Sequence, residues 1–301
     1  MTWRLISAAI IIPLLVGALI LDFKLGESDW VGHSGLVLIP LALLMTGMAA
    51  YELTSMIASR NPSTPQSIVI TGAIVTVACA GIPMLWKEYP PDCPVGKLGW
   101  TSLGLLLSVG IAIVFEMLRF KAADRVIANL AYSIFAIVYT GFLMSFLVGL
   151  RLTESNAIGM TALVSLLLIV KCCDAGAFFV GKLFGTRKLA PKMSPGKSVE
   201  GAIGAFLTGC LMSVVFFRWI APQISGDAVS PSILIAVVYG LIIAVTGLVG
   251  DLFESIIKRD FQAKDSSSWL RGLGGILDIF DSIFAAAPAA YVFWVMGFFD
   301  A

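Results

Sequence analysis

The chain alternates between long apolar blocks and short polar connections over its whole length. Each block has at least about 17 residues with few charges, which is long enough for a helix to cross a hydrocarbon core of roughly 30 Å. Backbone groups in lipid need hydrogen bonds within their own segment, so blocks of this kind should be helical. The pattern predicts an all-α, polytopic transmembrane helical bundle of about nine spans. These spans lie near 3–22, 36–56, 67–86, 99–119, 129–150, 157–182, 200–219, 232–250 and 282–299.

The first block holds Arg4 and Pro13 and lacks a short apolar core followed by a small-residue cleavage site. This favours a retained first span over a cleaved signal peptide, which is the alternative. No repeat, low-complexity tract or soluble domain interrupts the pattern. We therefore expect the whole chain, 1–301, to form a single integral membrane domain.

The basic residues of the connections fall unequally on the two sides of the membrane. The richer side receives fourteen, namely Arg4, Arg60, Arg119, Lys121, Arg125, Lys182, Arg187, Lys188, Lys192, Lys197, Lys258, Arg259, Lys264 and Arg271. The poorer side receives five, namely Lys24, Lys87, Lys97, Arg151 and Arg218. Lys and Arg accumulate in cytoplasmic connections, so this asymmetry predicts a cytoplasmic N-terminus and an external C-terminus.

Composition supports the membrane assignment, because 58% of the residues are hydrophobic and only 13% are charged. A soluble domain is about 45–50% apolar and about 25% charged. The net charge of +1 hides a local concentration, since nine of the twenty basic residues lie within 182–197 and 258–271. The five cysteines and the lone His33 have no metal-site spacing, and we assign them no role.

The first polar segment, 174–201, begins with an acid inside a predicted span. An ionisable group in lipid is costly and by default marks a functional site, so Asp174 is a candidate. Lys171 precedes it by three positions, which makes the two residues neighbours on a helix. The alternative is that Lys171 and Asp174 form an intrahelical pair that neutralises itself.

Further along the same segment, Ser194 to Ser198 reads as the start of a helix, with Ser198 as its N-cap and Gly201 opening the next span. The free backbone N–H groups of a helix N-terminus favour phosphate. Lys197 can add a point charge to such a site.

The second polar segment, 251–281, is too polar to cross lipid unaccompanied. Asp251 and Glu254 are three positions apart, as are Asp278 and Asp281, so each pair should share one helical face, with Lys258 on the face of the first pair. Clustered carboxylates suit Mg²⁺, which takes oxygen ligands and is commonly held by one or two carboxylates together with substrate phosphates. A solvated, charged surface loop is the alternative.

At these residues the chain resembles the CDP-diacylglycerol synthases, also called phosphatidate cytidylyltransferases. The likeness covers about sixty residues in the two polar segments, and the remaining spans match only in number and hydrophobicity. The residues in register with the family signature are Ser255, Lys258, Arg259, Lys264, Asp265, Gly272, Gly274, Gly275, Asp278 and Asp281.

The resemblance implies that a phosphatidic acid phosphate attacks the α-phosphorus of CTP and releases pyrophosphate. It implies Mg²⁺ as cofactor and leaves open whether a monovalent cation joins it. The implied metal ligands are Asp251 and Asp278, with Asp281, Asp174 and Glu254 as further ligands or as partners of ligands. The implied catalytic residues are Asp251, Asp278, Lys258 and Arg259, and the implied substrate contacts are Lys197, Ser194, Lys264, Asp265, Gly274 and Gly275.

The implied partners are CTP, phosphatidic acid and membrane lipids, with homodimerisation as a further family expectation and no nucleic acid. The active site should face the cytoplasm from the inner membrane, because one substrate is soluble and the other is anchored by its acyl chains. Residues 151–301 should carry the chemistry, whereas 1–150 should serve as scaffold and provide dimer contacts.

Three other functions are compatible with parts of the sequence. A transporter or channel could use Lys171 and Asp174 to line an ion path, although the charges gather at one end of the spans and no inverted repeat is evident. A related enzyme could use CTP with another lipid phosphate. A pseudoenzyme could retain the fold without turnover.

The last alternative arises because the glycine-rich turn departs from the family signature. Arg271, Leu273 and Ile279 stand where the family has Pro, His and Arg. Our hypothesis is that Arg271 supplies a phosphate contact from a shifted position. Arg271→Ala should then reduce cytidylyl transfer, and full activity of this variant would exclude that role.

Overall fold

The structure of the chain is a computed structural model that describes residues 2–28, 33–86, 89–120, 125–263, 266, 267, 269 and 274–299, with side chains from residue 9 onward. The chain divides into two compact units. The first combines Met1–Leu152 with Phe261–Ile279, and the second combines Thr153–Asp260 with Phe280–Ala301.

Within the described residues, nine helical stretches are long and apolar enough to cross a membrane, which confirms the predicted fold class. These stretches are Ala9–Glu27, Leu38–Ala58, Gln66–Leu85, Gly96–Leu118, Val126–Arg151, Asn156–Phe184, Val199–Ala228, Ile233–Asp260 and Ile276–Val295.

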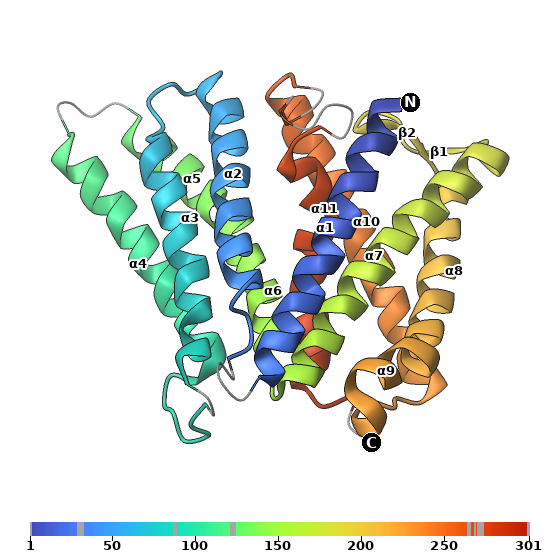
Figure 1. Cartoon of the computed structure of the whole chain (residues 1–301). Helices are drawn as coiled ribbons and strands as arrows, with labels where there is room; N and C mark the ends of the chain where they lie inside the picture. The colour runs from blue at the N-terminus through green and yellow to red at the C-terminus, as the bar shows by residue number, and fades with distance from the viewer. Residues whose placement is uncertain are drawn as a thin grey trace. The chain divides into compact units, whose positions relative to one another are not determined.

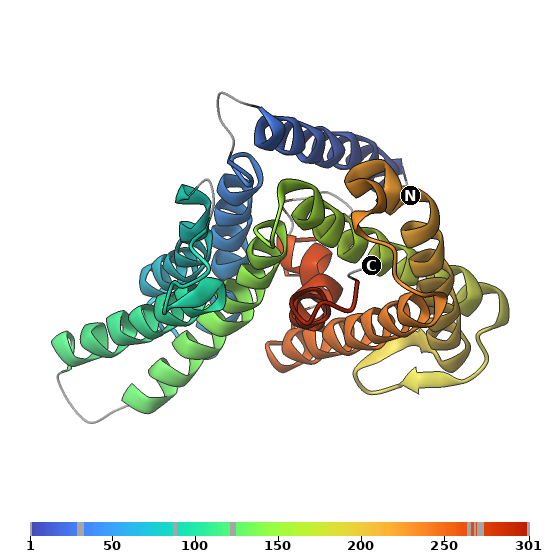
Figure 2. The same ribbon diagram turned by 90° about the horizontal axis from the view of Figure 1, so that it is seen from below.

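The first unit contains six α-helices that build its spans (Figures 1 and 2). They are α1 (Thr2–Glu27), α2 (Leu38–Ala58), α3 (Gln66–Gly81), α4 (Gly96–Leu118), α5 (Val126–Ala136) and α6 (Leu143–Arg151). A 3-10 turn, η1 (Ile82–Leu85), extends α3, and a π-helical turn, η2 (Ile137–Phe142), joins α5 to α6.

Helix α3 packs against both α2 and α4. Small residues let the backbones approach. A Cβ atom at Gly104 would lie 3.1 Å from Thr76 Cα, and one at Gly141 would lie 2.7 Å from Ala73 Cα. Close approach at small residues is a common way for membrane helices to associate, because packing rather than water drives their contact.

The second unit contains α7 (Asn156–Phe184), α8 (Val199–Val215), α9 (Ala221–Ser225), α10 (Ile233–Asp260) and most of α11 (Ile276–Val295). Helix α8 packs against α7 and α10. It continues through a π-helical turn, η3 (Phe216–Ile220), and the chain between α9 and α10 includes a short 3-10 turn, η4 (Gly226–Ala228).

Two of these helices extend into the segment that the sequence pattern had excluded from the membrane. Helix α10 runs past the expected end at 250 to Asp260, and α11 begins at Ile276 rather than near 282. The apolar pattern did not extend over these turns, whereas the spacing of their charged residues had predicted helical faces there. The start of α11 also has an apolar face, since Ile276 and Leu277 are buried.

An antiparallel hairpin between α7 and α8 was not predicted. Strand β1 (Lys188–Ala190) pairs with β2 (Ser194–Ser198), with Lys188 opposite Ser198 and Ala190 opposite Ser194. The strands are too short to produce a recognisable alternation, and the sequence predicted a helix start at Ser194–Ser198. In the structure these residues form β2, and the helix begins one residue later, at Val199. The second strand of the hairpin leads directly into the first turn of α8.

Many large apolar side chains on the membrane-length helices are exposed, as lipid-facing residues should be. Examples on α1, α4 and α8 are Ile10, Ile12, Leu14, Leu106, Leu107, Leu118, Leu207 and Leu211. A surface of this kind would favour aggregation in water, so it supports the membrane assignment.

An ion pair in the first unit links α1 to α6. Arg151 Nε lies 2.7 Å from Asp22 Oδ2, and both side chains are almost fully buried. Asp22 also accepts hydrogen bonds from the backbone N–H groups of Gly35, Val37 and Leu38 at the start of α2. Arg151 is therefore a structural residue, although the sequence analysis counted it among the connection charges.

Replacing Arg151 by Leu should destabilise the first unit by about 3–5 kcal/mol, because the Asp22 carboxylate would stay buried without its cation. SDS titration of the protein in mixed micelles would measure the loss. Arg218→Leu removes an exposed cation and should leave the unfolding midpoint unchanged. Equal stability of the Arg151 variant and the wild type would contradict this role for the pair.

Candidate active site

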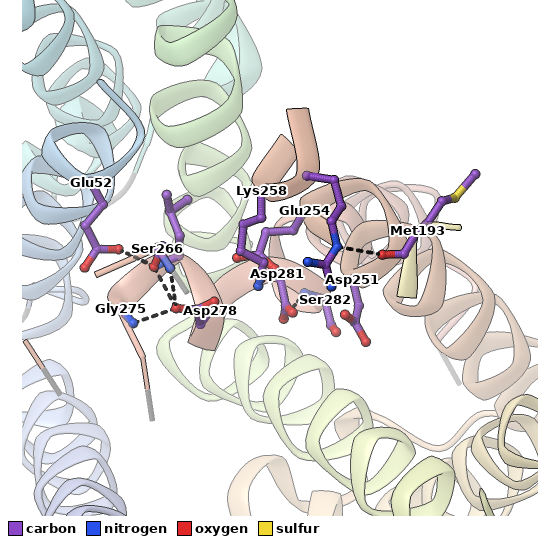
Figure 3. Close-up of polar contacts among 12 residues, drawn as sticks. Glu52, Met193, Asp251, Glu254, Lys258, Ser266, Gly275, Asp278, Asp281 and Ser282 are labelled. Carbon is purple, nitrogen blue, oxygen red and sulfur yellow. Dashed lines mark hydrogen bonds and ion pairs between the residues drawn. The ribbon is translucent and has the colours of Figure 1, made fainter. Parts of the chain in front are cut away.

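Three carboxylates of the second unit meet where α10 and α11 pack together. Asp251 and Glu254 lie on α10 and Asp281 lies on α11, and each contributes a ligand oxygen such that all three atoms lie within 4.8 Å of one another (Figure 3). The helix that continues through 251–260 confirms that Asp251 and Glu254 share one face. The third member comes from a residue thirty positions away in the sequence.

A glycine allows this close approach of the two helices. A Cβ atom at Gly250 would lie 2.5 Å from the carbonyl oxygen of Asp281 and 2.7 Å from Ala285 Cβ. A helical glycine costs stability relative to alanine, so its presence here reflects the contact that it permits. Gly250 thereby lets α11 present Asp281 beside Asp251.

Two lysines are paired with members of this acidic triad. Lys197 Nζ on β2 lies 2.6 Å from Asp251 Oδ2. Lys258 Nζ lies 2.6 Å from the Oε2 atom of Glu254, which precedes Lys258 by one turn of α10. The Glu254 side chain is only 3% exposed, whereas that of Asp251 is 32% exposed. The implied substrate contact Lys197 and the implied catalytic residue Lys258 thus lie directly beside the implied metal ligands.

The hairpin holds Lys197 in place through contacts at both of its ends. Ser198 accepts a hydrogen bond of 3.1 Å from Gly201 N, which confirms Ser198 as the N-cap of α8. Arg259 Nε donates to the carbonyl of Met193, which precedes Ser194, at 3.4 Å. Arg259 therefore connects the end of α10 to the hairpin.

Glu200, in the first turn of α8, ties the start of this helix to the chain that follows α7. Its carboxylate accepts hydrogen bonds from the backbone N–H groups of Thr186 and Arg187 and, at 2.7 Å, from the Thr186 hydroxyl. This acid has a structural partner for each oxygen, so its role differs from that of the triad.

A cavity of about 380 Å³ adjoins the Lys197–Asp251 pair within the second unit. Its polar wall includes Asp174, Lys182, Lys197 and Asp251, and its remaining wall is formed mainly by small and apolar residues of α7, α8 and α10. Ligand cavities typically have volumes of about 300–1,000 Å³, with a few polar groups in a largely apolar lining. The cavity can therefore hold part of a phosphorylated ligand beside the triad.

Asp174 lies on α7 and takes both a local and a distant partner. It forms the intrahelical ion pair with Lys171 that the sequence analysis considered, with a separation of 3.2 Å. The hydroxyl of Ser282 on α11 lies 3.4 Å from its other oxygen. Asp174 lines the cavity without belonging to the triad, and its role as a ligand stays a prediction.

Asp278 forms hydrogen bonds within the first unit, with residues of the chain that precedes α11. Its Oδ2 accepts hydrogen bonds from Gly275 N at 2.6 Å and from the Ser266 hydroxyl at 2.7 Å (Figure 3). Gly274 has a positive φ of 89°, which favours glycine over residues with a Cβ atom. Asp278 is thus oriented by its own turn, and metal ligation by this residue stays a prediction.

The triad has the chemistry that a hard divalent cation requires. Carboxylate oxygens suit Mg²⁺, Mn²⁺ and Ca²⁺ rather than softer metals. Asp251, Glu254 and Asp281 are the described residues whose carboxylates can converge on one ion. The remaining implied site residues, Lys264 and Asp265, lie outside the described residues, as do Arg271, Gly272 and Leu273 of the altered turn.

Glu52 on α2 was not predicted as a site residue. This carboxylate is 1% exposed and accepts hydrogen bonds from Ser266, Ser267 and the first backbone N–H groups of α11. A signal was available, because an acid inside a predicted span marks a candidate in the same way as Asp174.

Together, the fold and the site define a polytopic helical membrane protein with an acidic triad, paired lysines and an adjoining cavity. The chain belongs to the cytidylyltransferase family, whose model matches residues 2–296. Family membership confirms the resemblance drawn from the two polar segments.

Similar proteins include phosphatidate cytidylyltransferases from two bacteria. The chain is 30% identical to that of Chlamydia pneumoniae over 251 residues, which cover 82% of this chain and 78% of the relative. It is 42% identical to that of Haemophilus influenzae over 130 residues, which cover 43% and 44%. The uncharacterized protein YnbB of Escherichia coli is 32% identical over 191 residues, which cover 63% and 59%.

Gly250→Ala should separate α10 from α11, since the added methyl group would meet backbone atoms that cannot move aside as a side-chain end could. We expect a loss of about 1–3 kcal/mol in stability and a reduced turnover. Gly110→Ala is the matched control, because this position is also helical and has nothing within 4 Å of the added atom. Indistinguishable behaviour of the two variants would show that the helix contact does not depend on Gly250.

Proposed function

We propose that this chain is a CTP:phosphatidate cytidylyltransferase that makes CDP-diacylglycerol and pyrophosphate for phospholipid biosynthesis. The observation that carries the proposal is the acidic triad of Asp251, Glu254 and Asp281, paired with Lys197 and Lys258 next to a cavity. Family membership and the names of its relatives supply the reaction class.

In the proposed reaction, an oxygen of the phosphatidic acid phosphate attacks the α-phosphorus of CTP. A new phosphorus–oxygen bond forms, and the bond from the α-phosphorus to the oxygen that bridges it to the β-phosphate breaks. Pyrophosphate leaves with that bridging oxygen. Phosphoryl transfer of this kind needs positioning and neutralisation of charge rather than a covalent intermediate on the protein.

The residues of the site divide into two roles in this proposal. The triad would hold Mg²⁺, which supplies positive charge to the phosphates when bound. Lys197, Lys258 and Arg259 would contact phosphate oxygens, and Ser194 would contribute a polar contact from the hairpin. Asp174 and Asp278 are proposed as additional members of the metal site.

The proposed location of the site follows from the two substrates. CTP is soluble, whereas phosphatidic acid is held by its acyl chains, so the site should face the cytoplasm at the inner membrane. Basic residues at a membrane surface attract anionic lipid by about 1 kcal/mol each, which favours the side rich in lysine and arginine. Homodimerisation is a further proposal that rests on the family resemblance.

A second candidate is a CTP-dependent enzyme that acts on another lipid phosphate. The likeness to YnbB favours keeping it, because this relative, which matches 63% of the chain, is named only as an uncharacterized protein. Both candidates require CTP, and they differ in the lipid that accepts the cytidylyl group.

The proposal is tested by supplying the purified protein with labelled CTP and phosphatidic acid, with and without Mg²⁺. We expect a lipid-soluble cytidine product only when all three are present. Product formation from another lipid phosphate but not from phosphatidic acid would favour the second candidate. Solute transport in vesicles without CTP, in the absence of any cytidine lipid, would overturn the enzymatic proposal.

Asp251→Asn and Asp278→Asn should each lower the rate of product formation by about a hundredfold or more, because each substitution removes a charge that the proposed site requires. Membrane insertion should change little in both variants, and the thermal midpoint in detergent should change little in Asp251→Asn. Asp92→Asn removes an exposed carboxylate from a connection and should retain full activity. Normal turnover in both site variants would overturn the assignment.

A further inference from the structure

Glu52 forms the central contact between α2 and the chain that leads into α11. Its Oε1 accepts hydrogen bonds from the Ser267 hydroxyl at 2.7 Å and from Ile276 N at 3.0 Å. Its Oε2 accepts from the Ser266 hydroxyl at 3.0 Å and from Leu277 N at 3.0 Å. All of these residues belong to the first unit, and Figure 3 shows Glu52 and Ser266 facing each other.

The Glu52 carboxylate takes the place of an N-cap side chain for α11. Ile276 and Leu277 are the first residues of this helix, and their N–H groups have no acceptor within the helix. The preceding residue, Gly275, has no side chain that could cap them. A Cβ atom there would collide with the Ser266 hydroxyl and with the carboxylate of Glu52 itself.

Asp278 completes the cap from within the helix. It is the third residue of α11, and it accepts a hydrogen bond of 2.6 Å from Gly275 N. This is the position and the direction of the acidic residue in a capping box, in which the partner on the other side is normally a serine or threonine. Here that partner is Glu52, supplied by a helix more than 200 residues earlier.

An exposed aromatic contact reinforces this link. Tyr51, next to Glu52 on α2, stacks on Trp269 with ring centroids 5.4 Å apart and an interplanar angle of 24°. Consecutive residues of α2 thus hold the segment before α11 at two points, with a buried carboxylate and an exposed ring.

We propose that Glu52 is a positioning residue for the reaction, which fixes the start of α11 and with it the direction in which Asp278 projects. The catalytic consequence rests on the proposed function, whereas the anchoring does not. Negative charge at a helix N-terminus is favourable, and the two N–H groups would otherwise be left without partners in a buried region. Loss of Glu52 therefore loosens the first turn of α11.

Glu116 provides a matched control for the effect of a buried carboxylate as such. It lies on α4 of the same unit, is 3% exposed, and is bonded to Asn129 and Arg119 rather than to any described residue from 266 to 278. Glu116→Gln and Glu52→Gln are isosteric changes of similar burial. They differ in whether the start of α11 loses its acceptor.

The first experiment measures anchoring without reference to activity, by hydrogen exchange of the full-length protein in detergent. In Glu52→Gln and Glu52→Ala, backbone amides of 276–281 should exchange about tenfold faster, as expected for the loss of hydrogen bonds at a helix start. The same amides should be unchanged in Glu116→Gln. Unchanged exchange in both Glu52 variants would overturn the proposal.

The second experiment measures cytidylyl transfer from CTP to phosphatidic acid. Glu52→Gln should lower kcat about tenfold or more with little change in KM, because Asp278, a proposed member of the metal site, is misdirected while the cavity is intact. Glu52→Asp should restore part of kcat, and Glu116→Gln should match the wild type. Faster exchange combined with a normal kcat would overturn the positioning role. If the wild type makes no CDP-diacylglycerol, the proposed function fails, and the exchange result still decides whether Glu52 anchors α11.

Discussion

A carboxylate inside an apolar chain is stable only when the protein itself supplies its cations and hydrogen-bond donors, and this constraint organises both units of the structure. Asp22 is matched by Arg151 and by the first N–H groups of α2. Glu52 is matched by serines and by the first N–H groups of α11. Two buried acids thus serve as caps for helices to which they do not belong, so each one joins segments that are distant in the sequence.

Glu254 follows the same rule with a different outcome. Its counter-charge is the mobile end of Lys258 rather than a fixed backbone group. An acid held by backbone N–H groups has a structural role, because those donors are fixed in position and cannot reorient toward another acceptor. An acid held by a lysine can exchange its partner, since the four-carbon stem of lysine can reorient. This difference separates the structural acids Asp22 and Glu52 from Asp251 and Glu254, the two triad members that are paired with lysines.

The membrane architecture could be read from the sequence because its signal is repeated and strong. Nine apolar blocks predicted the nine stretches, and helical spacing predicted that Asp251 and Glu254 share a face. The spans expected to end at 250 and to begin near 282 are parts of longer helices, which agrees with the helical faces expected for 251–258 and 278–281.

The parts of the site that escaped prediction depend on partners far apart in the sequence. Spacing paired Asp278 with Asp281, but the fold gives Asp278 contacts with Ser266 and Gly275, while Asp281 joins α10. The link between Glu52 and Ser266 spans 214 positions, and no local pattern reports such a contact. The hairpin that carries Lys197 was equally invisible, because three paired residues in β1 are too few for a periodic signal.

The ion pairs of Lys197 and Lys258 also bear on the order in which charged ligands could bind. A divalent cation arriving alone would have to expel two ammonium groups from the triad, and an anion arriving alone would have to draw those groups away from their carboxylates. When both arrive, the anion draws the lysines away and frees the carboxylates for the cation. The cation in turn occupies the carboxylates and frees the lysines for the anion. Such a site would show reciprocal thermodynamic coupling, in which either ligand raises the affinity for the other by the same factor.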